Sequence, residues 1–286
     1  MWQVVLRTQA SPAAHGPRDA PGAPVSAVRP GPERPVALVT GASRGIGRAV
    51  ALRLGAEGFR LCLGARTAEA LRELAQELET AGADVLAARL DVRDPGSVDA
   101  FVQAALDRFG RIDLVVANAG VGGGATFPEM AAQDIEDLVA TNFLGALSTV
   151  RAALGPMLRQ RSGTLVLIAS VAGEVALPGS ALYAATKAGL VRFAEGLRRE
   201  VAGGGLKVTA ILPGFVRTDM TEGLGLPMPG PEVVAEAVLR AWRRGPRRIV
   251  VPGFYRPLIW LSHLAPSLVD LVGRRILREM AHAGRR

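Results

Sequence analysis

Short apolar runs alternate with longer helical stretches from Pro35 to Val251, and this alternation restricts the chain to few folds. The apolar runs are short and contain many β-branched residues, which is typical of buried strands. They cover residues 36–40, 60–64, 84–89, 113–117, 164–169, 207–212 and 248–251. The helical stretches cover residues 48–57, 67–81, 95–109, 134–161, 181–201 and 231–243. This order predicts an α/β fold, a doubly wound parallel sheet of about seven strands with helices on both faces.

The 286 residues divide into three parts. Residues 1–34 are rich in Pro, Ala and Gly without apolar periodicity, so we expect a disordered extension. Residues 35–253 carry the alternating pattern and are expected to form one domain. Residues 254–286 are expected to form a basic, partly apolar helical tail. Because no stretch reaches the roughly 20 apolar residues of a membrane-spanning helix, none is expected.

The sequence offers no pair of cysteines for an intramolecular disulfide and no cluster of metal-ligating residues. The single cysteine, Cys62, lies in a predicted strand and is interpreted as a core residue; it excludes an intramolecular disulfide. The three histidines, His15, His263 and His282, are scattered over the terminal segments. The sequence therefore predicts no metal site and no histidine-based catalytic triad.

Tyr183 and Lys187 are the strongest candidates for catalysis. Four residues apart on a predicted helix, their phenol and ammonium groups project from one face, one turn apart. A nearby cation favours phenolate, so Tyr183 can exchange a proton closer to neutral pH than its usual pKa of about 10 allows. The pair alone is equally compatible with an exposed structural pair, so other motifs have to decide.

A glycine loop, GASRGIG at residues 41–47, follows the first predicted strand and precedes a helix. In this context glycines permit a tight turn and close backbone approach, and the helix N-terminus offers free N–H groups to a phosphate. The spacing Gly-x3-Gly-x-Gly differs from the Gly-x-Gly-x-x-Gly dinucleotide pattern. A plain tight turn is the alternative interpretation.

Taken together, these motifs resemble those of the short-chain dehydrogenase/reductase family over roughly residues 35–251. Asn142, Ser170, Tyr183 and Lys187 fall in the order and spacing of the family's catalytic tetrad. The other matching segments are the glycine loop with Thr40, Asp91-Val92, Asn118-Ala119-Gly120, and Pro213-Gly214 with Thr218. The resemblance implies a Rossmann-type fold and an oxidoreductase whose nicotinamide cofactor carries the redox chemistry, without a metal.

The resemblance also implies roles for individual residues. Tyr183 is expected to donate a proton to the substrate carbonyl and Ser170 to orient it, while Lys187 lowers the pKa of Tyr183 and binds the nicotinamide ribose. Asn142 is expected to hold a water that links Lys187 to solvent. The expected cofactor-binding residues, besides Tyr183 and Lys187, are Gly41, Ser43, Arg44, Gly45, Ile46, Gly47, Arg66, Asp91, Val92, Asn118, Ala119, Gly120, Pro213, Gly214, Val216 and Thr218.

Two arginines favour NADP (NADPH) over NAD as the cofactor. An acidic residue just past the second strand would bind the ribose 2′-hydroxyl of NAD. That strand ends instead in Ala65-Arg66, and Arg44 lies inside the glycine loop. Two guanidinium groups suit a 2′-phosphate. Two solvated arginines in an arginine-rich chain are the alternative.

Positive charge is concentrated near the C-terminus. The formal net charge is +8, of which residues 240–286 contribute +9 and residues 1–34 contribute +2, leaving about −3 for the remainder. The catalytic part is therefore not expected to bind nucleic acid. Residues 254–286 are expected to pack on the protein, as a pocket cap or a subunit contact. Peripheral membrane contact and arginine-driven nucleic-acid binding are the alternatives.

These features predict hydride transfer between NADP(H) and a carbonyl or secondary alcohol on an apolar ketone, steroid-like or acyl substrate. Leu224, Leu226 and Met228 lie in a segment punctuated by Gly and Pro, which is expected to act as an apolar substrate lid, and Phe215 is a further candidate. A 3-oxoacyl thioester reductase and a catalytically idle NADP-binding sensor or scaffold are the alternatives. We expect a cytoplasmic homodimer or homotetramer, with peripheral membrane association as the alternative location.

Overall fold

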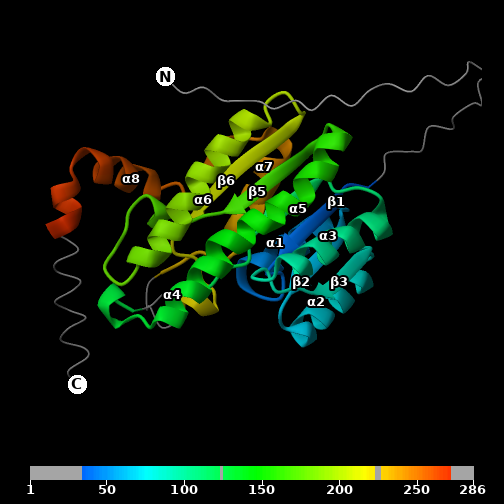
Figure 1. Ribbon diagram of the computed structural model, residues 1–286, viewed down its shortest axis with the longest axis horizontal. Helices are drawn as coiled ribbons and strands as arrows, with labels where there is room; N and C mark the ends of the chain where they lie inside the picture. The colour runs from blue at the N-terminus through cyan, green and yellow to red at the C-terminus, as the bar shows by residue number, and fades with distance from the viewer. Residues whose placement is uncertain (1–33, 123–124, 223–226, 272–286) are drawn as a thin grey trace, which may run out of the picture. The chain divides into compact units, whose positions relative to one another are not determined.

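The computed structural model describes residues 34–122, 125–222 and 227–271. Its seven strands form one parallel sheet in the order β3-β2-β1-β4-β5-β6-β7 (Figure 1). The strands are β1 (Val36–Thr40), β2 (Arg60–Ala65), β3 (Val85–Arg89), β4 (Leu114–Ala117), β5 (Gly163–Ile168), β6 (Leu206–Pro213) and β7 (Arg248–Val251). Each predicted strand is confirmed, with its ends within one residue of the expected position.

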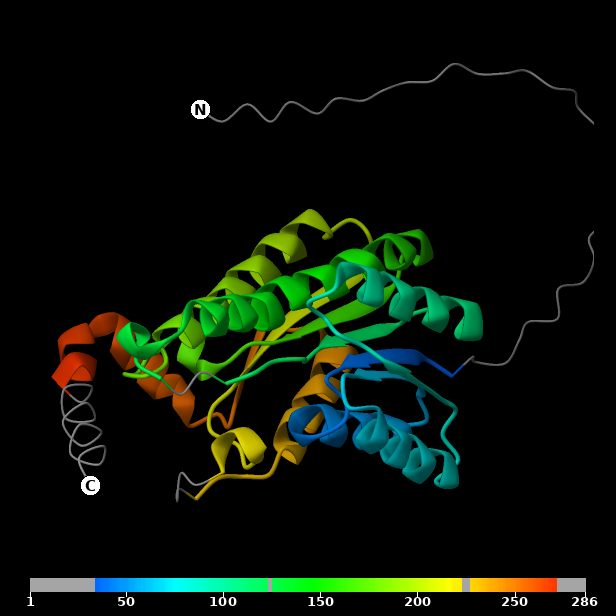
Figure 2. The ribbon, with the colours of Figure 1, turned by 60° about the horizontal axis from the view of Figure 1, so that its bottom comes forward.

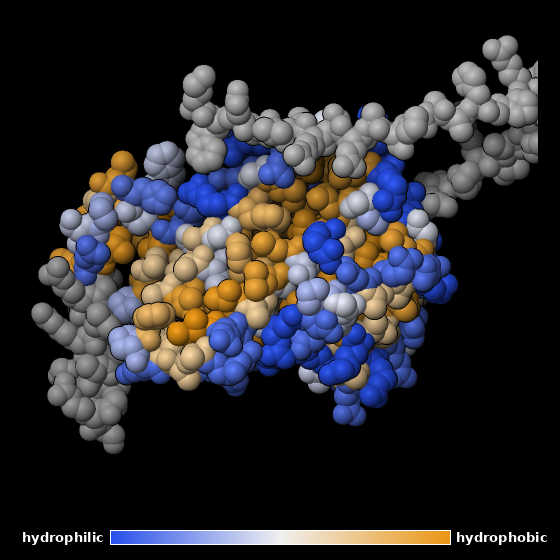
Figure 3. Space-filling view, in the orientation of Figure 1, coloured by the Kyte–Doolittle hydropathy of each residue, from blue (hydrophilic) through white to orange (hydrophobic). Residues whose placement is uncertain are grey.

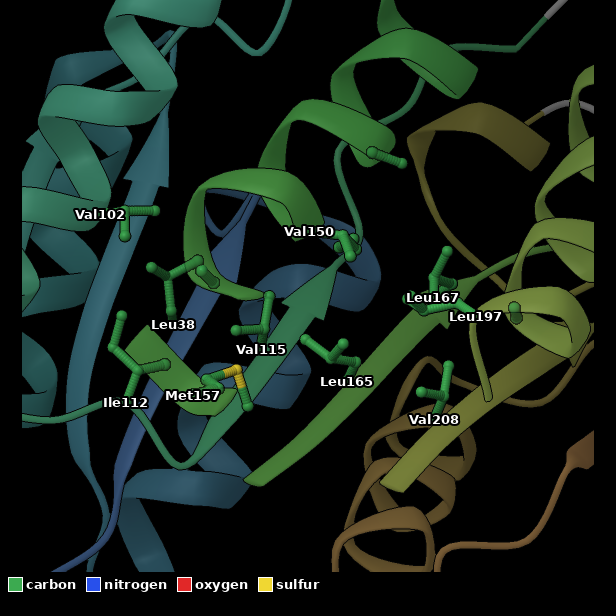
Figure 4. Close-up of a cluster of buried hydrophobic side chains, with 14 of the residues drawn as sticks. Leu38, Val102, Ile112, Val115, Val150, Met157, Leu165, Leu167, Leu197 and Val208 are labelled. Carbon is green, nitrogen blue, oxygen red and sulfur yellow. The ribbon is translucent and has the colours of Figure 1, made fainter. Parts of the chain in front are cut away.

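The two faces of the sheet bury separate apolar cores. In β1, Val36 and Leu38 face one core while Ala37 and Val39 face the other. The first core lies under α3 (Pro95–Phe109), α5 (Gly145–Gln160) and α6 (Ala181–Glu200). The second lies under α1 (Gly45–Ala56), α2 (Ala68–Thr80) and α7 (Glu232–Arg244). Figure 2 shows these two helical layers, and Figure 4 shows part of the first core. Burial on both faces explains why the strands are apolar throughout.

The chain crosses from one side of the sheet to the other between β3 and β4, so β1 and β4 become neighbours. Leu38 pairs with Val115 in this parallel register. In doubly wound sheets, ligands bind in the crevice at the carboxyl ends of the two strands that flank such a switch point. Short 3-10 turns follow β4, β5 and β6: η1 (Phe127–Glu129), η3 (Val171–Gly173) and η4 (Asp219–Thr221).

The predicted helix at residues 134–161 is interrupted. The structure has α4 (Ala132–Val139), then a π-helical turn, η2 (Ala140–Leu144), and then α5. The whole run Ala132–Gln160 is long and apolar enough to cross a membrane by length and composition, so the expectation that no stretch qualifies was wrong. Val150, Ala153 and Met157 of this run pack in the first core, which identifies it as a core helix of the domain.

The C-terminal segment begins with α8 (Tyr255–Leu264). Tyr255 and Ile259 pack against the first core, whereas Phe254, Trp260 and Leu264 are exposed. The predicted disorder of residues 1–34 falls, except for Arg34, outside the described residues, and so does the end of the tail from residue 272.

Candidate active site

The glycine loop between β1 and α1 is packed too tightly for side chains. A Cβ atom at Gly47 would lie 2.1 Å from the carbonyl oxygen of Gly41. Gly41 has a φ of +66°, and a Cβ there would lie 2.9 Å from the Cα of Ala119. Helix α1 has no side-chain cap at Arg44, so the N–H groups of its first turn remain available. This cradle fits the pyrophosphate of a dinucleotide.

Thr40 and Asn118 join the ends of β1 and β4. The Asn118 amide donates to the carbonyl oxygens of Thr40 and Gly41, at 2.9 and 3.1 Å. The Thr40 hydroxyl in turn accepts from the backbone N–H groups of Asn118 and Ala119, both at 3.1 Å. Thr40 belongs to the sequence motif of the glycine loop, but the sequence did not assign it a role.

Asn142 is fully buried in the π-helical turn. Its amide donates to the carbonyl of Val121 at 2.9 Å and accepts from the N–H of Val121 at 2.7 Å. A Cβ atom at Gly120 would lie 3.2 Å from Asn142 Oδ1 and 3.5 Å from Lys187 Nζ. The structure therefore brings Asn118, Gly120, Asn142 and Lys187 together, as predicted from the sequence. The water-holding role of Asn142 stays a prediction.

Lys187 is buried in the first half of α6. Its ammonium donates to the carbonyl of Ile168 at 2.9 Å and lies 5.6 Å from the centre of the Tyr183 ring. Burial lowers the pKa of Lys187 to about 8. The ammonium is thus positively charged at neutral pH although it lies within the protein.

Tyr183 and Ser170 share a side-chain hydrogen bond. Burial raises the pKa of the Tyr183 phenol, and the hydrogen bond with Ser170 opposes this only in part. The expectation that the pKa of Tyr183 is lowered was therefore wrong for this structure, because desolvation outweighs the favourable partner. The Ser170 hydroxyl also accepts from the N–H of Ala172 at 3.1 Å and donates to the carbonyl of Pro213 at 3.3 Å.

The segment after β6 returns to the glycine loop. A Cβ atom at Gly45 would lie 3.3 Å from the methyl group of Thr218, and Arg44 forms an ion pair with Asp219 at 3.1 Å. Thr218, one of the predicted cofactor-binding residues, thus lies beside the phosphate cradle.

Tyr255 of α8 also touches this segment. A Cβ atom at Gly214 would lie 2.0 Å from Cε2 of its ring, and the N–H of Phe215 donates to its hydroxyl at 3.3 Å. The sequence did not indicate this residue, because 41 residues separate it from Gly214 and no local pattern joins them.

The two arginines expected to bind the 2′-phosphate of the cofactor lie just beyond the ends of β1 and β2, which are neighbouring strands. Arg44 and Arg66 are exposed, and the N–H of Ala42 donates to the carbonyl of Gly64 at 3.1 Å, so the glycine loop lies beside the end of β2. Asp91, one of the predicted cofactor-binding residues, has its carboxylate bound by Arg93 at 2.7 Å. The Arg93 hydrogen bond holds the pKa of Asp91 below its usual range, and the charge of Arg66 contributes.

The remaining predicted residues lie around the same cradle or beneath it. Ser43 and Ile46 are half-buried in the glycine loop. Val92 and Val216 are buried, Val92 against Gly145 and Val216 in the second core. Leu224 and Leu226 of the predicted lid lie outside the described residues, whereas Met228 lines a hollow of about 480 Å³ with Arg217, Pro227 and Pro229.

Known proteins are similar to this chain in sequence and in fold. Residues 35–227 match the family model of the short chain dehydrogenases. A Staphylococcus aureus 3-oxoacyl-(acyl-carrier-protein) reductase, FabG, is 39% identical over 189 residues, which are 66% of this chain and 77% of that protein. A crystal structure of an actinorhodin polyketide ketoreductase variant with NADPH has a TM-score of 0.72 at 33% identity, covering 77% of this chain and 97% of that one. A Burkholderia phymatum short chain dehydrogenase/reductase in complex with NAD has a TM-score of 0.78 at 28% identity, covering 82% and 95%.

Replacing Lys187 with Met should stabilise the fold at neutral pH. The pKa of Lys187 in the native protein, about 8, lies below its ordinary value of 10.5, so the unfolded chain binds more protons between these values and wild-type stability rises with pH there. Removing the buried charge should raise the free energy of unfolding by on the order of 1–3 kcal/mol below pH 8, after loss of the hydrogen bond to Ile168. Urea unfolding as a function of pH measures this. A gain that does not shrink as the pH rises to 10.5 would contradict it.

Gly214→Ala should disturb the contact between α8 and the segment after β6. The added methyl group would overlap the Tyr255 ring, so we expect the free energy of unfolding to fall by about 1–3 kcal/mol and kcat/KM to fall with it. Adding Tyr255→Ala removes the overlap, so the effects of the two substitutions should not add. Gly203→Ala is the control, since a Cβ there meets nothing within 4 Å. Additive effects would show that the contact is unimportant.

Proposed function

The chain belongs to the short-chain dehydrogenases, a family of oxidoreductases, and on that basis we propose that it transfers hydride between NADP(H) and a carbonyl or secondary alcohol on an apolar substrate. The observation that carries this proposal is the meeting of Ser170, Tyr183 and Lys187 at the carboxyl ends of the strands. These groups lie beside a glycine cradle that fits a dinucleotide.

In the reduction direction the bound nicotinamide supplies a hydride to the carbonyl carbon. As the carbon–oxygen π bond opens, the oxygen gains negative charge and needs both stabilisation and a proton. The raised pKa of Tyr183 keeps its phenol protonated at neutral pH, so it can supply that proton. The Ser170 hydroxyl, which accepts from the N–H of Ala172, turns its single proton from the carbonyl of Pro213 to the same oxygen. The Lys187 ammonium stabilises the tyrosinate that forms until a proton from solvent restores the phenol.

Arg44 and Arg66 support NADP(H) as the cofactor. Both are exposed at the end of the strand pair β1 and β2, where the ribose of a dinucleotide on this loop would lie. Solved relatives bind either cofactor, since one structure contains NADPH and another NAD. The preference therefore rests on these two arginines and on the lack of an acidic residue at the end of β2.

Exposed apolar side chains near the site support an apolar substrate. Phe215 follows Gly214 directly, and a Cβ atom at Gly122 would lie 3.1 Å from Met220. Both side chains are exposed. A 3-oxoacyl thioester is the second candidate substrate, because one relative is a 3-oxoacyl-(acyl-carrier-protein) reductase and another a polyketide ketoreductase.

We also propose that the protein is a cytoplasmic homodimer or homotetramer that binds no nucleic acid. Apolar residues gather where α5 and α6 lie on the face seen in Figure 3. Leu144 and Leu158, at the two ends of α5, are exposed. Such a surface supports association with a second copy.

The function is tested by NADPH oxidation over simple ketones, steroids and 3-oxoacyl thioesters. We expect turnover with apolar carbonyls and a loss of roughly 10²–10⁴ in rate for Tyr183→Phe, which keeps the ring but removes the proton donor. NADPH binding, followed by fluorescence, should be unchanged in this variant. Tight NADPH binding without turnover on any substrate would instead favour an idle cofactor-binding protein. Preference for small charged keto acids would contradict the apolar site.

Arg44→Ala and Arg66→Ala should each weaken NADPH binding tenfold or more and barely affect NADH. Loss of one charge-assisted hydrogen bond costs about 1.5–3 kcal/mol, and only NADPH carries the 2′-phosphate. Arg108→Ala is a matched control, because Arg108 is also an exposed arginine in an ion pair, with Asp84 beside the start of β3. If Arg44→Ala and Arg66→Ala weakened NADPH and NADH binding equally, these two arginines would not recognise the 2′-phosphate.

A further inference from the structure

The chain that follows β6 reaches the active site through Pro213, Gly214 and Phe215. Strands β6 and β7 are parallel neighbours that end side by side, with Pro213 paired to Val251. Helix α8 begins at Tyr255, shortly after the end of β7, so its first residue lies next to the residues that follow β6. The register of these two strands therefore places Tyr255 beside Gly214.

Tyr255 contacts two consecutive residues of this segment with two different parts of its side chain. The ring lies so close to Gly214 that a Cβ atom there would overlap it. The hydroxyl accepts from the N–H of Phe215 at 3.3 Å. Tyr255 also packs against the first core, as does Ile259 one turn further along α8. The side chain is thus held by the domain and is placed to hold the chain on both sides of Gly214.

The peptide group between Pro213 and Gly214 is bound at both of its polar ends. Its N–H donates to the carbonyl of Val251 at 2.7 Å, and its carbonyl accepts from the Ser170 hydroxyl at 3.3 Å. Because a peptide group is planar, a rotation that moves one end also moves the other. Glycine restricts its backbone dihedrals least, and the N–H of the next peptide group is bound by Tyr255. Tyr255 therefore limits rotation at the residue where this segment could turn most freely.

The hydrogen bond between Ser170 and Pro213 is long for two oxygen atoms. Bonds from a hydroxyl to an oxygen acceptor are usually about 2.7–2.8 Å, and this one measures 3.3 Å. Ser170 has a single proton, which has to leave this carbonyl when a substrate oxygen arrives. A carbonyl kept at this distance orients the hydroxyl but holds its proton weakly. A carbonyl that moved closer would compete with the substrate for the proton.

We propose that Tyr255 is a positioning residue of the active site, which keeps the carbonyl of Pro213 where it orients the Ser170 hydroxyl without retaining its proton. Tyr255 acts through the backbone of the segment after β6 and takes no part in proton transfer. The inference rests on the proposed function, because it requires Ser170 to donate a hydrogen bond to the substrate.

The first test is Tyr255→Phe, which removes the hydroxyl and keeps the ring against Gly214. We expect kcat for reduction of a ketone by NADPH to fall about three- to tenfold, the value of one neutral hydrogen bond. In the Ser170→Ala background the same substitution should change the remaining rate by less than about twofold, because the group on which Tyr255 acts is gone. Ser262→Ala is the matched control. It also removes one hydroxyl hydrogen bond from α8, to the carbonyl of Ile259 at 2.8 Å, and should keep the wild-type kcat.

Amide hydrogen exchange gives a second measurement that does not depend on activity. The Phe215 amide should be protected in the wild type, because Tyr255 accepts its N–H. Tyr255→Phe should speed its exchange by a factor similar to the loss in kcat, whereas Ser262→Ala should leave it unchanged.

Four results would each overturn this inference while leaving the proposed function intact. They are an unchanged kcat in Tyr255→Phe, an equal loss in Ser262→Ala, additive effects of Tyr255→Phe and Ser170→Ala, and a Phe215 amide that exchanges without protection in the wild type. A wild-type protein that binds NADPH but reduces no carbonyl would overturn both the inference and the proposed function.

Discussion

Burial of both faces of the parallel sheet determines where this protein can carry out chemistry. Helices cover each face, so only the strand ends and the loops that follow them are open to a ligand. Two of the candidate catalytic side chains accordingly follow or contact the end of a strand. Lys187 donates to the carbonyl of Ile168, the last residue of β5, and Ser170 lies two residues further on. Parallel pairing brings these ends to one edge of the sheet, so residues far apart in sequence form one site.

The site is held together by close backbone approach rather than by charge. Gly47 and Gly120 leave room where a methyl group would meet Gly41, Asn142 or Lys187. The buried ammonium of Lys187 is the exception, because its desolvation costs stability that one hydrogen bond to a carbonyl recovers only in part. A protein selected for stability alone would not bury this charge. Its retention beside Tyr183 is understandable if the tyrosinate formed during turnover needs it.

The sequence was sufficient to predict the strands of the sheet, and insufficient where tertiary contacts decide the structure. The strands were predictable because burial on both faces leaves unbroken apolar runs. The π-helical turn was not, since the amide of Asn142 in this turn pairs with the backbone of Val121, and no local pattern shows that contact. The pKa of Tyr183 was predicted in the wrong direction, because spacing shows a nearby cation but not the burial that raises the pKa of the phenol. The sequence also did not indicate Tyr255, because its contact with Gly214 joins segments that are distant in sequence.

Helix α8 is held to the domain near both of its ends. At its start the Tyr255 ring lies on Gly214, and near its end His263 lies 3.4 Å from the carboxylate of Glu174. The side chain of Glu174 is buried and forms an ion pair with Arg248 of β7 at 2.8 Å. His263 therefore contacts a carboxylate that is itself fixed to the sheet. A helix fixed at two points on its inner side presents its outer side in one orientation.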